Sequence, residues 1–114
     1  MSETNATPIR VYIVESQVLF CKALAQVFSA EPGITVVGDS GSISAHGLSA
    51  AAPDIVVLDL DGLHDFGDAL NVCRTAVPAA RICALTMRLQ PEIMQRCLAI
   101  TTGIPLTSLD LKQA

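Results

Sequence analysis

The chain has 114 residues, a formal net charge of −4 and a hydrophobic content of 51%. Its seven Lys and Arg residues are scattered, which argues against nucleic-acid binding by this chain alone, because such binding needs clustered basic side chains. The mean hydropathy of +0.51 is high, but no apolar run approaches the roughly 18 residues of a membrane span. We expect a polar, disordered tail over residues 1–8, without the features of a secretory signal. Residues 9–114 are then one folded domain of a cytoplasmic protein.

Five short apolar runs along the chain are predicted to be β-strands. They are Ile9–Val14, Ile34–Val37, Ile55–Leu58, Ile82–Leu85 and a weaker run at Ile104–Leu106. Such nearly continuous apolar runs are typical of parallel strands buried on both faces.

The segments between these runs have helical spacing. Apolar side chains recur at intervals of three and four from Val18 to Phe28, and Glu31-Pro32-Gly33 ends that pattern. Further helices are predicted over Ser44–Ala52, over Phe66–Val77 and from Pro91 onward. Strands that alternate with helices in this way indicate right-handed crossovers and a parallel sheet with helices on both faces.

In such a sheet the functional crevice lies beyond the carboxyl ends of the strands. The polar residues that end the predicted strands are Glu15, Ser16, Asp59, Thr86, Thr107 and Ser108. We expect Glu15, Ser16, Asp59 and Thr86 to converge in one pocket.

Other side chains that could carry chemistry have simpler interpretations. The four cysteines, Cys21, Cys73, Cys83 and Cys97, lack C-x-x-C spacing and lie in apolar stretches, so we expect buried, reduced thiols rather than a metal or redox site. His46 and His64 are isolated. The acidic cluster of Asp61, Asp65 and Asp68 is typical of a solvated loop and a helix N-terminus rather than of a calcium site.

Three segments resemble the receiver domain of two-component response regulators. Pro53–Leu60 resembles the third strand of a receiver, with Asp59 in the place of the phosphorylated aspartate. Ile9–Ser16 resembles its first strand and Ala84–Met87 its fourth. The phrases Val36-Val37-Gly38 and Leu85-Thr86-Met87 are similar to the NarL/FixJ or LuxR-type branch, whose members usually carry a C-terminal helix-turn-helix. The resemblance covers about residues 9–108.

The resemblance implies a fold and a reaction. The fold is a flavodoxin-like, doubly wound α/β domain with a parallel five-stranded sheet of order 2-1-3-4-5. The reaction is phosphoryl transfer from a histidine kinase to Asp59. In that family Mg²⁺ is held by the acceptor and two acidic residues after the first strand. A Ser or Thr after the fourth strand, here Thr86, contacts the phosphoryl oxygens, and a Lys after the fifth neutralises them.

The chain departs from this pattern at several positions. Glu15 keeps the first acidic position and Ser16 is a neutral residue at the second, so we expect Mg²⁺ held by Asp59 and Glu15 to bind weakly. Ser108 stands where the family has its Lys, and Pro105 replaces the aromatic switch residue. Asp61 would offer a backbone carbonyl to a metal and also adds negative charge.

The predicted function is that of a signalling receiver with weakened aspartyl phosphorylation, not an enzyme. It would form the N-terminal part of a LuxR-type transcription regulator, with DNA bound only through a C-terminal domain absent from this sequence. The chain ends where the fifth helix of a receiver would begin, so that helix is missing or truncated. We therefore expect exposed sheet residues, Val11 and Ile13 among them, and a homodimer.

Two alternatives stay open. One is a pseudo-receiver that acts as a protein-interaction or dimerisation module without phosphorylation. The other is a small α/β redox or nucleotide-binding protein, which the absence of glycines in Glu15-Ser16-Gln17 disfavours.

Overall fold

A parallel sheet forms the centre of the molecule in the computed structural model, which describes residues 7–63 and 65–86. Its strands are β1 (Ile9–Val14), β2 (Ile34–Ser40), β3 (Ile55–Asp59) and β4 (Arg81–Leu85). They pair in parallel in the order β2-β1-β3-β4. The first four positions of the predicted order are therefore confirmed, and the run at Ile104–Leu106 lies outside the described residues.

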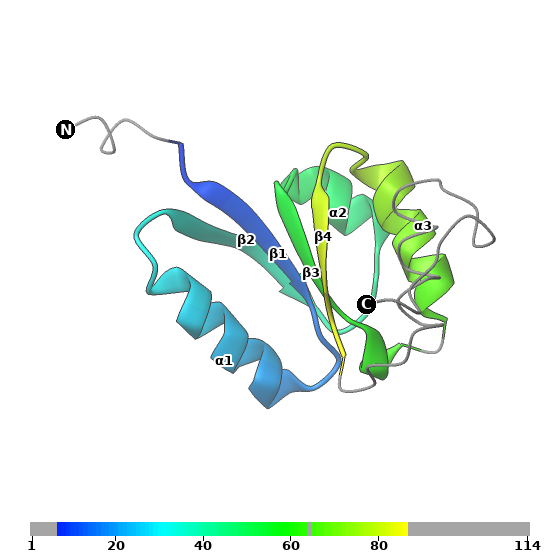
Figure 1. Cartoon of the computed structure of the whole chain (residues 1–114), viewed down its shortest axis with the longest axis horizontal. Helices are drawn as coiled ribbons and strands as arrows, with labels where there is room; N and C mark the ends of the chain where they lie inside the picture. Colours follow the sequence, from blue (N-terminus) through cyan, green and yellow to red (C-terminus); the bar gives the residue numbers. More distant parts are fainter. Residues whose placement is uncertain (1–6, 64, 87–114) are drawn as a thin grey trace, which may run out of the picture.

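Helices cover both faces of the sheet, as the alternating pattern predicts (Figure 1). They are α1 (Val18–Ser29), α2 (Ala45–Ala51), α3 (Phe66–Ala76) and a short 3-10 helix, η2 (Leu60–Gly62). Ser44 accepts a hydrogen bond from the Gly47 N–H and so caps α2. The helix predicted from Pro91 lies outside the described residues. Within them, no helix is long and apolar enough to cross a membrane.

Two apolar layers sandwich the sheet. On one face α2 and α3 supply Leu48, Leu70 and Cys73, which pack with Val56 and Leu58 of β3. On the other face α1 supplies Cys21, with Leu24, Ala25 and Phe28 at its margin, over a buried set made of Val11, Ile13 and Val57. The central strands β1 and β3 are thus buried on both faces, as their apolar runs predict.

Two expectations about exposure are wrong. Val11 and Ile13 are only 2% and 0% exposed, because α1 covers them. Cys83 is exposed, because β4 is an edge strand of the described sheet and no described helix covers it on the side of Val57, its partner in β3.

The β2 strand is longer than predicted, and a bulge lies within it. Val11 pairs with Val36 but Tyr12 pairs with Gly38, so Val37 is an extra residue in the ladder. A Cβ atom at Gly38 would lie 2.7 Å from Cε2 of the buried Tyr12 ring. Tyr12 in turn donates a hydrogen bond from its hydroxyl to Ser40 Oγ, at 3.2 Å. The glycine therefore lets β2 pass close to this ring and extend to Ser40.

We predict that Gly38→Ala destabilises the domain by about 1–3 kcal/mol, because the buried Tyr12 ring must move to admit a methyl group. Urea unfolding of the purified chain measures the change. Gly33→Ala is the matched control, since no atom lies within 4 Å of a Cβ built there. Equal stabilities of the two variants would contradict this account of the bulge.

Candidate functional site

Strand register brings the candidate residues to one edge of the sheet. Val14 of β1 pairs with Leu58 of β3, and an acidic residue follows each of them. Glu15 comes directly after β1, and Asp59 is the last residue of β3. Asp59 pairs with Leu85 of β4, which Thr86 follows. The predicted convergence of these strand ends is therefore confirmed.

Glu15 is a buried carboxylate at this edge. Its side chain is 2% exposed, and Oε1 has no hydrogen-bond partner among the described residues. Oε2 accepts a hydrogen bond from the Gln17 N–H at 3.1 Å. Burial, aided by the neighbouring Asp59 carboxylate, raises the pKa of Glu15 above its ordinary value of 4.5. A charge is thus held where water screens it poorly.

Asp59 begins the turn that follows β3. Its Oδ1 accepts a hydrogen bond from the Asp61 N–H at 3.2 Å and so caps η2. A Cβ atom at Gly62 would lie 2.5 Å from Ser16 Oγ and 3.3 Å from Asp59 Oδ2. The glycine thus allows the turn to approach the end of β1. The Ser16 and Asp59 side chains both lie next to Gly62.

Thr86 is linked to Asp61, on the turn that follows Asp59. Its hydroxyl donates a hydrogen bond to Asp61 Oδ1 at 2.7 Å. The sequence predicted that Asp61 belongs to the acidic pocket with Glu15 and Ser16, where it would offer a backbone carbonyl and add negative charge. The structure adds a side-chain contact with Thr86. The sequence does show an acidic residue two positions after the acceptor. It does not show that this side chain reaches β4, because that contact depends on how the η2 turn packs.

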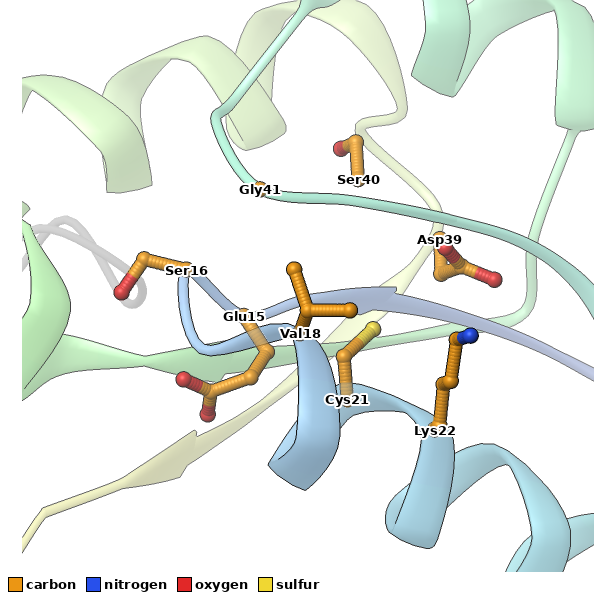
Figure 2. A pocket seen from close by; sticks show the side chains of 8 residues that line it. All are labelled: Glu15, Ser16, Val18, Cys21, Lys22, Asp39, Ser40 and Gly41. Atoms are coloured by element: carbon orange, nitrogen blue, oxygen red, sulfur yellow. The ribbon is translucent and has the colours of Figure 1, made fainter.

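The candidate residues line two cavities at this edge. Figure 2 shows the first, of about 110 Å³, between the end of β1, the start of α1 and the end of β2. Its lining includes Glu15 and Ser16 at one end and Lys22 and Asp39 at the other. The second, of about 240 Å³, is lined by Phe20, Asp59, Asp61, Leu85 and Thr86. Glu15 and Ser16 line the first cavity, and Asp59 and Thr86 line the second, so the single pocket expected from the sequence stays a prediction.

The donor set fits a divalent cation poorly. Within the described residues, no group of three or more His, Cys, Asp or Glu side chains is arranged to hold a metal ion. Glu15 supplies an unpartnered buried oxygen, but Ser16 offers no charge beside it, and Mg²⁺ prefers near-octahedral oxygen sites with carboxylate charge. No chemical step is therefore assigned to a metal here.

The remaining predicted residues have mostly structural roles. Cys21 and Cys73 are buried, and burial raises the pKa of the Cys73 thiol to about 11. Asp65 caps α3 by accepting a hydrogen bond from the Asp68 N–H, as expected of a helix N-terminus. His46 is exposed on α2. Five positions lie outside the described residues: His64, Cys97, Pro105, Thr107 and Ser108.

Sequence comparison finds relatives among bacterial signalling proteins, although no family model matches the chain. The DNA-binding transcriptional activator DevR/DosR of Mycobacterium tuberculosis is 31% identical over 91 residues, which are 75% of this chain and 41% of that protein. Protein-glutamate methylesterase/protein-glutamine glutaminase 1 of Xanthomonas campestris is 30% identical over 75% of this chain and 25% of that protein. The chain spans less than half the length of these relatives.

Structural comparison finds the same class. The signal receiver domain of NarL from Mycobacterium tuberculosis superposes with a TM-score of 0.72 at 20% identity, over 83% of this chain and 79% of that one. The response regulator domain of Thermotoga maritima CheB gives a TM-score of 0.70 at 17% identity, over 82% and 73%. These likenesses show the receiver fold.

The fold, the position of Asp59 at the end of β3 and the sequence relatives define the class: a CheY-like α/β receiver. The chain is similar to the receiver domains of two-component response regulators, and LuxR- and NarL-type regulators are among its structural neighbours.

We predict that Glu15→Gln raises the free energy of unfolding by about 1 kcal/mol at pH 7, because it removes an incompletely paired buried charge. A carboxyl with a raised folded-state pKa stabilises the fold below its unfolded pKa, near 4.5, and loses that contribution as pH rises through the folded value. The advantage of the variant should therefore shrink as pH falls from 7 toward 4.5. Urea unfolding across this range, with the exposed Glu31→Gln as control, measures it. An advantage independent of pH would contradict the assignment.

Proposed function

We propose that this domain receives a phosphoryl group on Asp59, and that its phosphorylation is weaker than in receivers with a complete acidic site. The observation that supports the proposal is the arrangement at the carboxyl edge. Asp59 is at the end of the central strand β3, with Glu15 beside it, and Thr86 reaches the η2 turn that Asp59 caps. Asp59 is partly buried and lines a cavity that a donor can enter.

The chemistry of the step is a direct displacement. An Asp59 carboxylate oxygen forms a bond to phosphorus as the bond from phosphorus to the donor breaks, and the donor leaves with the electron pair. Such a transfer needs its developing negative charge neutralised. Among the described residues, the second cavity is lined by two carboxylates and no basic side chain. Ser16 removes a further acidic ligand from the edge, which supports weak cation binding and slow transfer.

We propose a phosphoryl donor and a whole protein of the kind found among the relatives. A histidine kinase would be the donor in the cell, and the whole protein would be a LuxR-type transcription regulator in the cytoplasm, with DNA bound by a separate C-terminal domain. The similarity to a transcriptional activator over 75% of this chain supports this setting. Enzymatic activity of the methylesterase kind is not proposed, since the chain spans only 25% of that relative.

A second candidate function is a phosphorylation-independent module for dimerisation or partner binding. It is supported by apolar side chains exposed along α1, namely Val18, Leu19, Phe20 and Val27. Exposed apolar residues that cluster on one element mark interaction surfaces. This surface takes the place of the Val11 and Ile13 surface expected from the sequence.

We predict that acetyl phosphate with Mg²⁺ labels the chain slowly, about tenfold or more below a receiver with a complete site, because a missing charge-assisted contact costs roughly 1.5–3 kcal/mol. Intact-protein mass spectrometry follows the added phosphoryl group. Asp59→Asn should abolish it. Ser16→Asp should raise both the labelling rate and the Mg²⁺ affinity, whereas Ser42→Asp, which adds the same charge in an exposed loop, should change neither.

Rapid and stoichiometric labelling of the unmodified chain would show that its site is not weakened. Absence of labelling even in Ser16→Asp would favour the phosphorylation-independent module.

We predict that the chain self-associates through α1. Sedimentation velocity should show a concentration-dependent dimer that Leu19→Lys/Val27→Lys converts to a monomer, because these side chains are 83% and 64% exposed. The matched control is Gln26→Lys/Ser29→Lys, which adds the same charge at two exposed polar positions of α1. A monomer at high concentration in the unmodified chain would contradict this prediction.

A further inference from the structure

The contact between Asp61 and Thr86 has a consequence beyond the placement of Thr86 at the edge. The Thr86 hydroxyl donates to Asp61 Oδ1 at 2.7 Å, and the Asp61 N–H donates to Asp59 Oδ1 at 3.2 Å. Asp61 therefore bridges the proposed phosphoacceptor and the end of β4. The acceptor in the Thr86 bond is a carboxylate, which makes the bond stronger than one between neutral groups.

The position of Asp61 is fixed independently of Thr86. Leu60, the first residue of η2, is 1% exposed and belongs to the core between the sheet and the helices α2 and α3. The Leu63 N–H donates to the Leu60 carbonyl at 3.3 Å and closes the turn. Because the turn is anchored at Leu60, the Asp61 carboxylate is held in place to accept the hydroxyl.

Strand β4 is an edge strand of the described sheet. Within the described sheet, β4 pairs only with β3, and three of its five residues are exposed. The bond from Thr86 to Asp61 therefore ties the last part of this edge strand to the η2 turn.

We propose that Asp61 is a built-in ligand of Thr86, which holds the end of β4 against the η2 turn whether or not Asp59 carries a phosphoryl group. A threonine hydroxyl has one proton to donate, so a phosphoryl oxygen on Asp59 and the Asp61 carboxylate compete for it. The Asp61 carboxylate also repels a phosphoryl dianion in the same cavity. The end of β4 is thus insensitive to phosphorylation, since a conformational equilibrium responds only to differential contacts.

The inference rests on the proposed function only where it concerns the phosphoryl group, and its test has two separate parts. The first part uses the unmodified chain and Asp61→Ala without any phosphoryl compound. Amide hydrogen exchange at Leu85 and Thr86 should be about tenfold faster in Asp61→Ala, the scale of one lost charge-assisted bond. Thr86→Val should show the same acceleration, and Asp61→Ala should add little to it.

The matched control is Asp68→Asn, which removes a negative charge in the exposed first turn of α3 and should leave exchange at β4 unchanged. Asp61→Asn, which keeps the size of the side chain and a neutral oxygen acceptor, should fall between Asp61→Ala and the unmodified chain. It also serves if Asp61→Ala does not fold. Equal exchange at Leu85 and Thr86 in the unmodified chain, Asp61→Asn and Asp68→Asn would overturn the proposal.

The second part adds beryllofluoride and Mg²⁺ at concentrations that saturate Asp59, with binding followed by ¹⁹F NMR. The methyl resonance of Thr86 should stay unchanged in the unmodified chain and shift in Asp61→Ala. A shift of equal size in both proteins would overturn the proposal. Absence of bound beryllofluoride in either protein would instead count against phosphorylation of Asp59 and leave the exchange result to decide the role of Asp61.

Discussion

Burial of β1 and β3 on both faces is the constraint on which the site depends. Each strand has an apolar layer above and below it, so a slip of one residue would turn every core side chain to the wrong layer. The register that results places the ends of β1 and β3 beside each other, with Glu15 following Val14 and Asp59 following Leu58. Two carboxylates are therefore brought together by packing, although their charges repel each other.

This packing has an electrostatic cost, because it buries the Glu15 carboxylate beside the Asp59 carboxylate. Glu15 is almost fully buried, has one oxygen without a partner among the described residues and lies close enough to Asp59 to raise its own pKa. A buried, incompletely paired carboxylate opposes folding, and sites of function are where proteins tolerate such costs. The position of Glu15 is thus better explained by the chemistry of the edge than by stability of the core.

The sequence predicts those features that local patterns encode. The runs that form β1, β3 and β4 follow from hydrophobicity, and the pairing order follows from the resemblance. The extension of β2 past Val37 could not be predicted, because it depends on the contact of Gly38 with the Tyr12 ring across two strands. The exposure of Cys83 was missed for a related reason: its apolar surroundings in sequence do not reveal that β4 lies at an edge of the described sheet. The parts of the site at Ser108 and Pro105 remain predictions.

The Asp61 carboxylate stands at a different position from the second acidic residue of the family pattern, and it makes a different contact. Relative to the family pattern, the chain lacks an acidic residue at Ser16 and has one at Asp61, so the edge still carries three carboxylates with Glu15 and Asp59. A carboxylate at position 16 would lie next to Glu15 at the end of β1, whereas Asp61 lies on the η2 turn and accepts the hydroxyl of Thr86. Three converging carboxylates favour a cation, because their mutual repulsion is relieved when one binds. In this chain the Asp61 carboxylate instead accepts the Thr86 hydroxyl, so the charge at this position links the η2 turn to the end of β4.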